Sequence, residues 1–179
     1  MNRRLFERAR APRALALATS LCVTLPLSTA GCTTLNDILP AGECSTGRTW
    51  MNGDESSPLM HPGGDCVGCH AERGGNAPKL TIAGTVMNAL KDDTDCGGID
   101  KVIVEVTDAD NNVHTMTTNA AGNFFLREPE VPLALPFTVK LTLDGKERAM
   151  MTPQSNGSCV TCHTPEGKNG APGRILAPK

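Results

Sequence analysis

The sequence predicts a mainly β protein, a small antiparallel β-sandwich flanked by two irregular loops. Three observations carry this prediction. Residues 80–151 consist of short β-rich runs divided by turns, with no helical period. The 179-residue chain contains 18 Gly and 13 Pro, which favours turns over long helices. Finally, one loop sequence occurs twice, at 59–79 and at 152–179, on either side of the β-rich stretch.

Six runs are expected to form strands, because they are rich in β-branched and aromatic residues and are bounded by turn residues. They are 80–87, 102–107, 113–118, 123–127, 137–143 and 146–151. Val102, Val104 and Val106 stand at alternate positions and would give one strand an apolar face. Asp144-Gly145 predicts a two-residue type I′ hairpin turn between the last two runs. Short strands joined by turns favour an antiparallel sandwich.

Three segments of this stretch carry a resemblance to a known kind of module. They are Ala83-Gly84-Thr85-Val86, Thr118-Asn119-Ala120-Ala121-Gly122-Asn123-Phe124 and Pro136-Phe137-Thr138-Val139. The stretch resembles the carboxypeptidase-regulatory-like, prealbumin-type modules. The resemblance implies the sandwich fold and a passive scaffold without catalytic activity.

Residues 1–31 are organised like the signal peptide of an exported protein. A basic start is followed by an apolar stretch at 14–27, which is shorter than the roughly 20 residues that a membrane span needs. The next residues are Ser28-Thr29-Ala30-Gly31-Cys32. They resemble a bacterial lipobox, although Thr29 replaces the usual aliphatic residue. The resemblance implies cleavage before Cys32 and a lipid anchor on Cys32; ordinary cleavage nearby with a free Cys32 is the alternative.

Export decides what happens to the cysteines, because thiols outside the cytoplasm form disulfides or are captured by a ligand. Of the eight cysteines, Cys22 lies in the signal peptide and Cys32 at its end. Cys44 and Cys96 belong to no motif, so we expect them to form a disulfide that ties the N-terminal tail, 32–58, to the sandwich at 80–151.

The remaining four cysteines form two C-x-x-C-H motifs, Cys66-Val67-Gly68-Cys69-His70 and Cys159-Val160-Thr161-Cys162-His163. This is the attachment motif of c-type haem, in which two thiols add to the two vinyl groups and the histidine binds the iron. We therefore expect two covalently bound haem c groups. A four-cysteine zinc site and a thioredoxin-like redox pair are the alternatives. Zinc does not require a histidine after each second cysteine, and no βαβ pattern surrounds either motif.

The repeat extends beyond the motifs and bears on the sixth iron ligand. Both copies fit M-x-P-x(3–5)-C-V-x-C-H-x(3)-G-x-N-x(0–1)-A-P, which places Met60 and Met151 at matching positions. These two methionines are the first candidates for distal ligands, unless they only pack against the haem face. His61, which is matched by Thr152, and His114 are the other candidates. A five-coordinate, open iron is the third possibility.

The two motifs in an exported chain resemble those of small exported dihaem c-type cytochromes. The resemblance implies one-electron transfer with redox partner proteins, in the periplasm or at the outer membrane or cell surface, with the membrane reached through the lipid on Cys32. No Ser-His-Asp set or phosphate loop is present, so an electron carrier is expected rather than an enzyme. A net charge of −2 argues against a nucleic-acid partner. A dihaem peroxidase-like enzyme and a zinc-binding structural β module are the alternative functions.

The expected strand count also predicts where the two motifs lie relative to each other. Short connections make consecutive strands antiparallel, so an even number of strands returns the chain to the end where it started. With six strands between the loops, both motifs should lie at one end of the sandwich, close enough for direct electron exchange.

Overall fold

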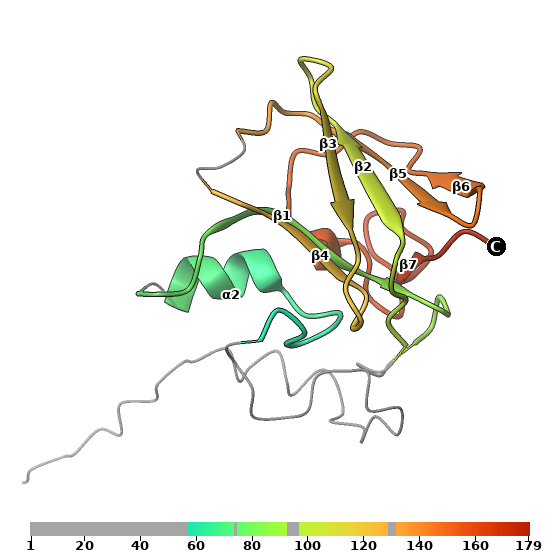
Figure 1. Cartoon of the computed structure of the whole chain (residues 1–179), viewed down its shortest axis with the longest axis horizontal. Coiled ribbons are helices and arrows are strands. Elements are labelled where there is room, and N and C mark those ends of the chain that lie inside the picture. Colours follow the sequence, from blue (N-terminus) through green and yellow to red (C-terminus); the bar gives the residue numbers. More distant parts are fainter. Residues whose placement is uncertain (1–56, 74, 93–96, 129–131) are drawn as a thin grey trace, which may run out of the picture.

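The computed structural model describes residues 57–73, 75–92, 97–128 and 132–179 (Figure 1). Its elements, in chain order, are α2 (Cys66–Arg73), β1 (Leu80–Met87), β2 (Ile103–Thr107), β3 (Val113–Thr117), β4 (Asn123–Arg127), β5 (Thr138–Leu143), β6 (Lys146–Ala149), the 3₁₀ turn η1 (Cys159–Thr161) and β7 (Ile175–Leu176). No helix in this part of the chain is long and apolar enough to cross a membrane. The predicted signal peptide, the lipidation site Cys32 and the predicted Cys44–Cys96 disulfide lie outside the described residues.

The strands form two sheets, with the orders β4-β1-β7 and β3-β2-β5-β6. All six expected strands are present, and two sheets agree with the predicted β-sandwich. Two features differ from the expectation. A seventh strand, β7, pairs in parallel with the end of β1, so the sandwich is not purely antiparallel. The first flanking loop is not wholly irregular either, because its motif begins the α-helix α2.

The core lies between the two sheets and is largely aliphatic. Val102, Val104 and Val106 are fully buried, while the intervening Ile103 is exposed, as their alternation predicts. The expected turn at Asp144-Gly145 is also found: both residues have positive φ, 50° and 75°, as a type I′ turn requires. The β5–β6 hairpin register, which pairs Leu143 with Lys146, follows from this turn.

Strand β1 is the exception in this sandwich, because both of its faces are covered. Ile82 and Val86 point into the core between the sheets. Ala83, Thr85 and Met87 alternate with them and are buried too, so they face a second cover. Figure 1 shows α2 and the chain before it on the side of β1 and β4 that faces away from the larger sheet. The first C-x-x-C-H loop is therefore the outer layer over β1.

Candidate functional site

The first motif begins an eight-residue helix, α2, whose start is fixed by Asp65. The backbone N–H of Gly68 donates to Asp65 Oδ1 at 2.9 Å, which makes Asp65 the N-cap residue. Within a helix, positions i, i+3 and i+4 lie on one face. The helix therefore places Cys66, Cys69 and His70 on one side.

A chain of buried hydrogen bonds fixes the loop before α2 onto the sheet. Gly63 N–H donates to the hydroxyl of Thr85 at 2.7 Å, and that hydroxyl donates to Asn123 Oδ1 at 2.7 Å. The amide of Asn123 in turn donates to the carbonyl of Met60 at 3.0 Å. Thr85 and Asn123 are both buried, so breaking this chain would leave polar groups without partners inside the protein.

The second motif is held along one edge of β1. Ala83 N–H donates to the carbonyl of Gly157 at 3.0 Å, just before the motif. The chain then leaves the sheet, makes the three-residue turn η1 and returns as β7, which pairs with the end of β1. The loop that carries Cys159, Cys162 and His163 is therefore anchored to β1 at both of its ends.

Gly84, in the middle of β1, provides the space that Cys159 occupies. A Cβ atom added to Gly84 would lie 2.9 Å from the sulfur of Cys159 and 2.8 Å from the Phe124 ring. Contacts this short are not tolerated between non-bonded atoms. The absence of a side chain at Gly84 thus lets the Cys159 thiol pack directly on the strand.

The two motifs begin next to each other. The hydroxyl of Ser158 donates to Asp65 Oδ1 at 2.5 Å, and these two residues directly precede Cys159 and Cys66. Burial raises the pKa of the Cys66 thiol to about 11, and Asp65 adds to the effect. Burial likewise raises the pKa of Cys159 to about 12, with Cys66 and Cys162 contributing through their charge. The expected proximity of the motifs is therefore found, although they meet across the middle of β1 and not at an end of the sandwich.

Both motif histidines use Nδ1 in the same way. His70 Nδ1 lies 2.7 Å from the carbonyl oxygen of Pro78, and His163 Nδ1 lies 2.9 Å from that of Gly173. A carbonyl oxygen only accepts hydrogen bonds, so in each ring the proton sits on Nδ1. This leaves the lone pair on Nε2, the arrangement by which proteins orient a histidine toward a metal.

A cavity of about 370 Å³ opens beside the second motif. Cys159, Cys162 and His163 all line it. Its apolar walls come from both sheets and from the segment after β1, and they include Leu90, Phe124, Phe137, Val139, Leu141 and Leu176. A concave, mostly apolar space of a few hundred Å³ with a few polar groups is typical of cofactor sites. The second motif therefore combines an apolar cavity with two thiols and one imidazole in its wall.

The candidate distal methionines differ in their surroundings. Met60 is half-buried in the first loop, with its carbonyl held by Asn123. Met151 is 92% exposed and lines the cavity beside the second motif. Its neighbour Met150 is half-buried, packs against the core and lines the same cavity. Met60 and Met151 remain predictions, and Met151 would need to turn inward to reach an occupant.

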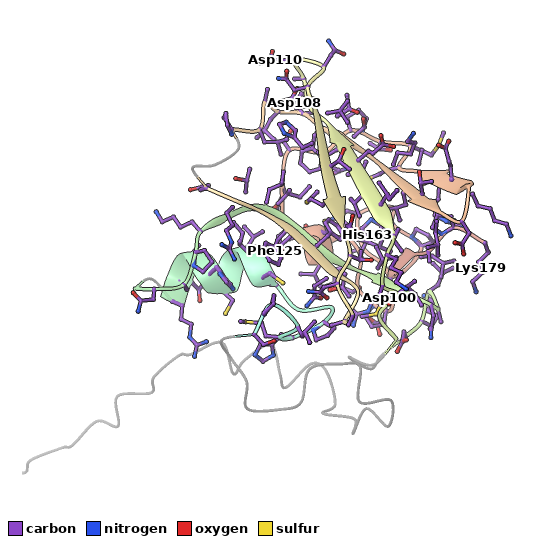
Figure 2. All side chains as sticks on the ribbon, viewed as in Figure 1. Asp100, Asp108, Asp110, Phe125, His163 and Lys179 are labelled. Carbon is purple, nitrogen blue, oxygen red and sulfur yellow. The ribbon has the colours of Figure 1, made fainter. Side chains whose placement is uncertain are left out.

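The candidate distal histidines lie in different places. His61 belongs to the first loop, where it adopts a positive φ of 44°. His114 is on β3, and its Nε2 lies 3.1 Å from Asp108 Oδ2. Figure 2 shows Asp108 and Asp110 at one tip of the sandwich, well away from His163. His114 is therefore engaged at the β2–β3 turn, away from the second motif.

The four motif cysteines are not equivalent. Cys66, Cys159 and Cys162 are free thiols. Cys69 is disulfide-bonded. A thioether at Cys69 would require this disulfide to be reduced first, because both bonds use the same sulfur. The first motif thus fits haem in its histidine geometry and, at Cys69, only in the reduced state.

Among the residues with a described position, no group of three or more His, Cys, Asp and Glu could hold a metal ion. No protein-family model, no curated protein and no solved structure matches the chain.

Several residues at the site are not indicated by the sequence patterns: Asp65 and Ser158, which join the two motifs, and Met150 and Arg174, which line the cavity. For the first two a signal exists. Asp and Ser are favoured N-cap residues, and they stand directly before Cys66 and Cys159 in the two copies of the repeat. Met150 and Arg174 carry no such signal, because their position depends on how distant segments pack.

Proposed function

We propose that the chain is an exported, membrane-anchored dihaem c-type cytochrome that carries out one-electron transfer. One observation carries the proposal: in both C-x-x-C-H motifs, a backbone carbonyl from the motif's own loop holds His Nδ1 and leaves Nε2 to bind iron. The same arrangement recurs in both copies of the repeat, as expected if both histidines bind iron.

The fit is most complete at the second motif. Cys159 and Cys162 would form the thioethers and His163 Nε2 would bind the iron, while the apolar walls of the cavity exclude water. Haem c supplies a one-electron couple between ferrous and ferric iron. At the first motif Cys66, Cys69 and His70 would take the same roles, once Cys69 has been released from its disulfide.

The contribution of the protein is to hold the two sites close together. The Ser158–Asp65 hydrogen bond and the shared strand β1 fix the start of each motif against the other. Electrons could then pass between two haems without movement of either loop. A lipid on Cys32 would keep the carrier at a membrane, near its redox partner proteins.

Mass spectrometry of the denatured mature protein tests the proposal, because thioether bonds survive unfolding. We expect two haems per chain. The Cys159→Ser/Cys162→Ser variant should retain one haem, as should Cys66→Ser/Cys69→Ser. A protein purified from a host that attaches haem c, yet carrying none, would refute the assignment. Binding of carbon monoxide by the reduced wild type would show an open iron and favour the peroxidase-like alternative.

A further inference from the structure

One carboxylate lies where the two motifs meet. Asp65 Oδ1 accepts a hydrogen bond from the backbone N–H of Gly68, inside the first motif, at 2.9 Å. The same oxygen accepts a hydrogen bond from the hydroxyl of Ser158 at 2.5 Å. Asp65 directly precedes Cys66, and Ser158 directly precedes Cys159. The carboxylate is therefore fixed close to the first attachment cysteine of each motif.

Gly68 provides the space for this carboxylate. A Cβ atom added to Gly68 would overlap with Asp65 Oδ2, so the absence of a side chain there lets the carboxylate lie over the first turn of α2. In the second copy of the repeat the matching residues are Ser158 and Thr161. The hydroxyl of Thr161 donates to the carbonyl of Ser158 at 2.7 Å. The second copy thus brings no charge of its own to this position and lies against that of Asp65.

The charge of Asp65 acts on its surroundings. None of the ion pairs among the described residues includes Asp65. The residue is half-buried, so water and salt screen its charge only in part. Burial is the main cause of the raised pKa of the Cys66 thiol, and the charge of Asp65 raises that pKa further. A partly screened negative charge also stabilises ferric over ferrous iron, because the ferric ion carries one positive charge more.

We propose that Asp65 lowers the reduction potentials of both haems through its charge, although it belongs to the loop of only one of them. The inference rests on the proposed function and adds a residue that binds neither iron. Because both potentials shift in the same direction, the difference between them changes less than either value. That difference sets the free energy of electron exchange between the two haems. A shared charge therefore shifts the pair relative to its redox partners without opposing this exchange.

Redox titration of the haem-loaded mature chain tests the inference. Asp65→Asn keeps an oxygen that accepts both hydrogen bonds and remains a favoured N-cap residue, but it removes the charge. Both midpoint potentials should rise. Should the Asn variant not fold, Asp65→Ser serves the same purpose, because serine is the uncharged residue at the matching position of the second copy. A rise confined to one of the two potentials would overturn the inference.

Glu72→Gln is the matched control for this titration. It removes the same amount of charge from the same helix, but at an exposed position outside the C-x-x-C-H motif. Water and salt screen an exposed charge more fully, so both potentials should rise less in Glu72→Gln than in Asp65→Asn. Equal shifts in the two variants would mean that only net charge matters, and would overturn the inference.

The single-haem chain Cys66→Ser/Cys69→Ser gives the sharpest test, because it carries only the haem of the second motif. Adding Asp65→Asn to this chain should still raise the remaining potential, since Asp65 is hydrogen-bonded to the residue before Cys159. An unchanged potential would overturn the inference and leave the proposed function intact. Absence of haem from the wild-type mass spectrum would instead refute the proposed function, and this inference with it.

Discussion

The two C-x-x-C-H motifs share a pattern but not a conformation. The first begins an eight-residue α-helix that covers the outer face of β1, whereas the second makes a three-residue 3₁₀ turn at the edge of that strand. The flanking residues explain the difference. Ala71-Glu72-Arg73 lets the first helix continue, while Pro165, close behind His163, lacks an N–H and disfavours helix at the residue before it. The spacing of the motif thus specifies its chemistry and its context specifies its shape.

The residues before each motif show the same dependence on context. Asp65 caps its own helix and also accepts a hydrogen bond from the hydroxyl of Ser158. Ser158, at the equivalent position of the second copy, makes no side-chain cap to its own turn. Asp65 therefore makes a hydrogen bond in each motif. The hydroxyl of Ser158 bonds to Asp65 and does not cap its own turn.

The largest expected effect concerns the irons themselves. If Met60 and Met151 are distal ligands, Met60→Ala and Met151→Ala should each open one iron to carbon monoxide, whereas Met150→Ala should mainly destabilise the core, by about 2–5 kcal/mol. The reduced-state spectrum with carbon monoxide measures this. Opening in Met150→Ala but not in Met151→Ala would move the ligand to the half-buried methionine. Opening only in His61→Ala and His114→Ala would contradict the argument from the repeat.

The next largest effect is expected from a substitution in β1 that should affect haem attachment at one motif and not at the other. Gly84→Ala places a methyl group against Cys159 and Phe124, and overpacking of this kind costs about 1–3 kcal/mol. Because the displaced thiol belongs to the second motif, we expect haem attachment to fall there and to persist at the first. Mass spectrometry and urea unfolding measure the two effects.

Gly75→Ala is the control for this substitution. A Cβ at Gly75 meets no atom within 4 Å, so only its positive φ of 64° opposes the change, by about 1–2 kcal/mol. Equal loss of haem from both motifs in Gly84→Ala would show that the contact with Cys159 is not specific.

Some elements of the fold can be predicted from the sequence and others cannot. The six strands were predictable, because β-branched runs and the Asp144-Gly145 turn are local signals. Strand β7 was not, since two residues, Ile175 and Leu176, carry no alternation and form a strand only because an edge of β1 is available. Helix α2 was not predictable either, because it is only eight residues long and includes Gly68, which disfavours a helix.

The candidate site likewise contains features with a local sequence signal and features without one. The motif cysteines and histidines lie close together in sequence, so the haem prediction depends only on local spacing. The Asp65–Ser158 bond and the placement of Arg174 at the cavity join segments far apart in the chain, and nothing local indicates them.

A smaller effect is expected where the two motifs touch. Asp65→Ala removes the N-cap of α2 and the bond to Ser158, and should cost about 1–2 kcal/mol. Ser158→Ala removes the bond alone and should cost about 0.5–1.5 kcal/mol. Chemical denaturation of both variants and of the double variant gives the coupling energy. A value near zero would mean that the two motifs lie together without stabilising each other.

The smallest effect concerns Asp108, whose contribution to stability changes only at acid pH. We expect this change to affect the two motifs equally. Burial alone would raise the pKa of Asp108, but hydrogen bonds from His114 and Asn112 outweigh it and hold that pKa well below its ordinary value of 3.8. Because the folded state binds this proton less readily than the unfolded state, Asp108 contributes stability above pH 3.8 that is lost as the pH falls below it. Asp108→Asn should therefore flatten the acid end of the stability profile, measured by urea unfolding between about pH 2 and about pH 6.

This acid effect also tests the comparison of the motifs. Asp108 lies at the β2–β3 turn, outside both motif loops, so its loss should act through the stability of the whole fold and weaken both sites alike. Haem spectra recorded during acid unfolding should change together for the two sites in the wild type and in Asp108→Asn. If one haem signal is lost at a distinctly higher pH, that motif unfolds on its own, and its anchoring to β1 is weaker than its contacts indicate.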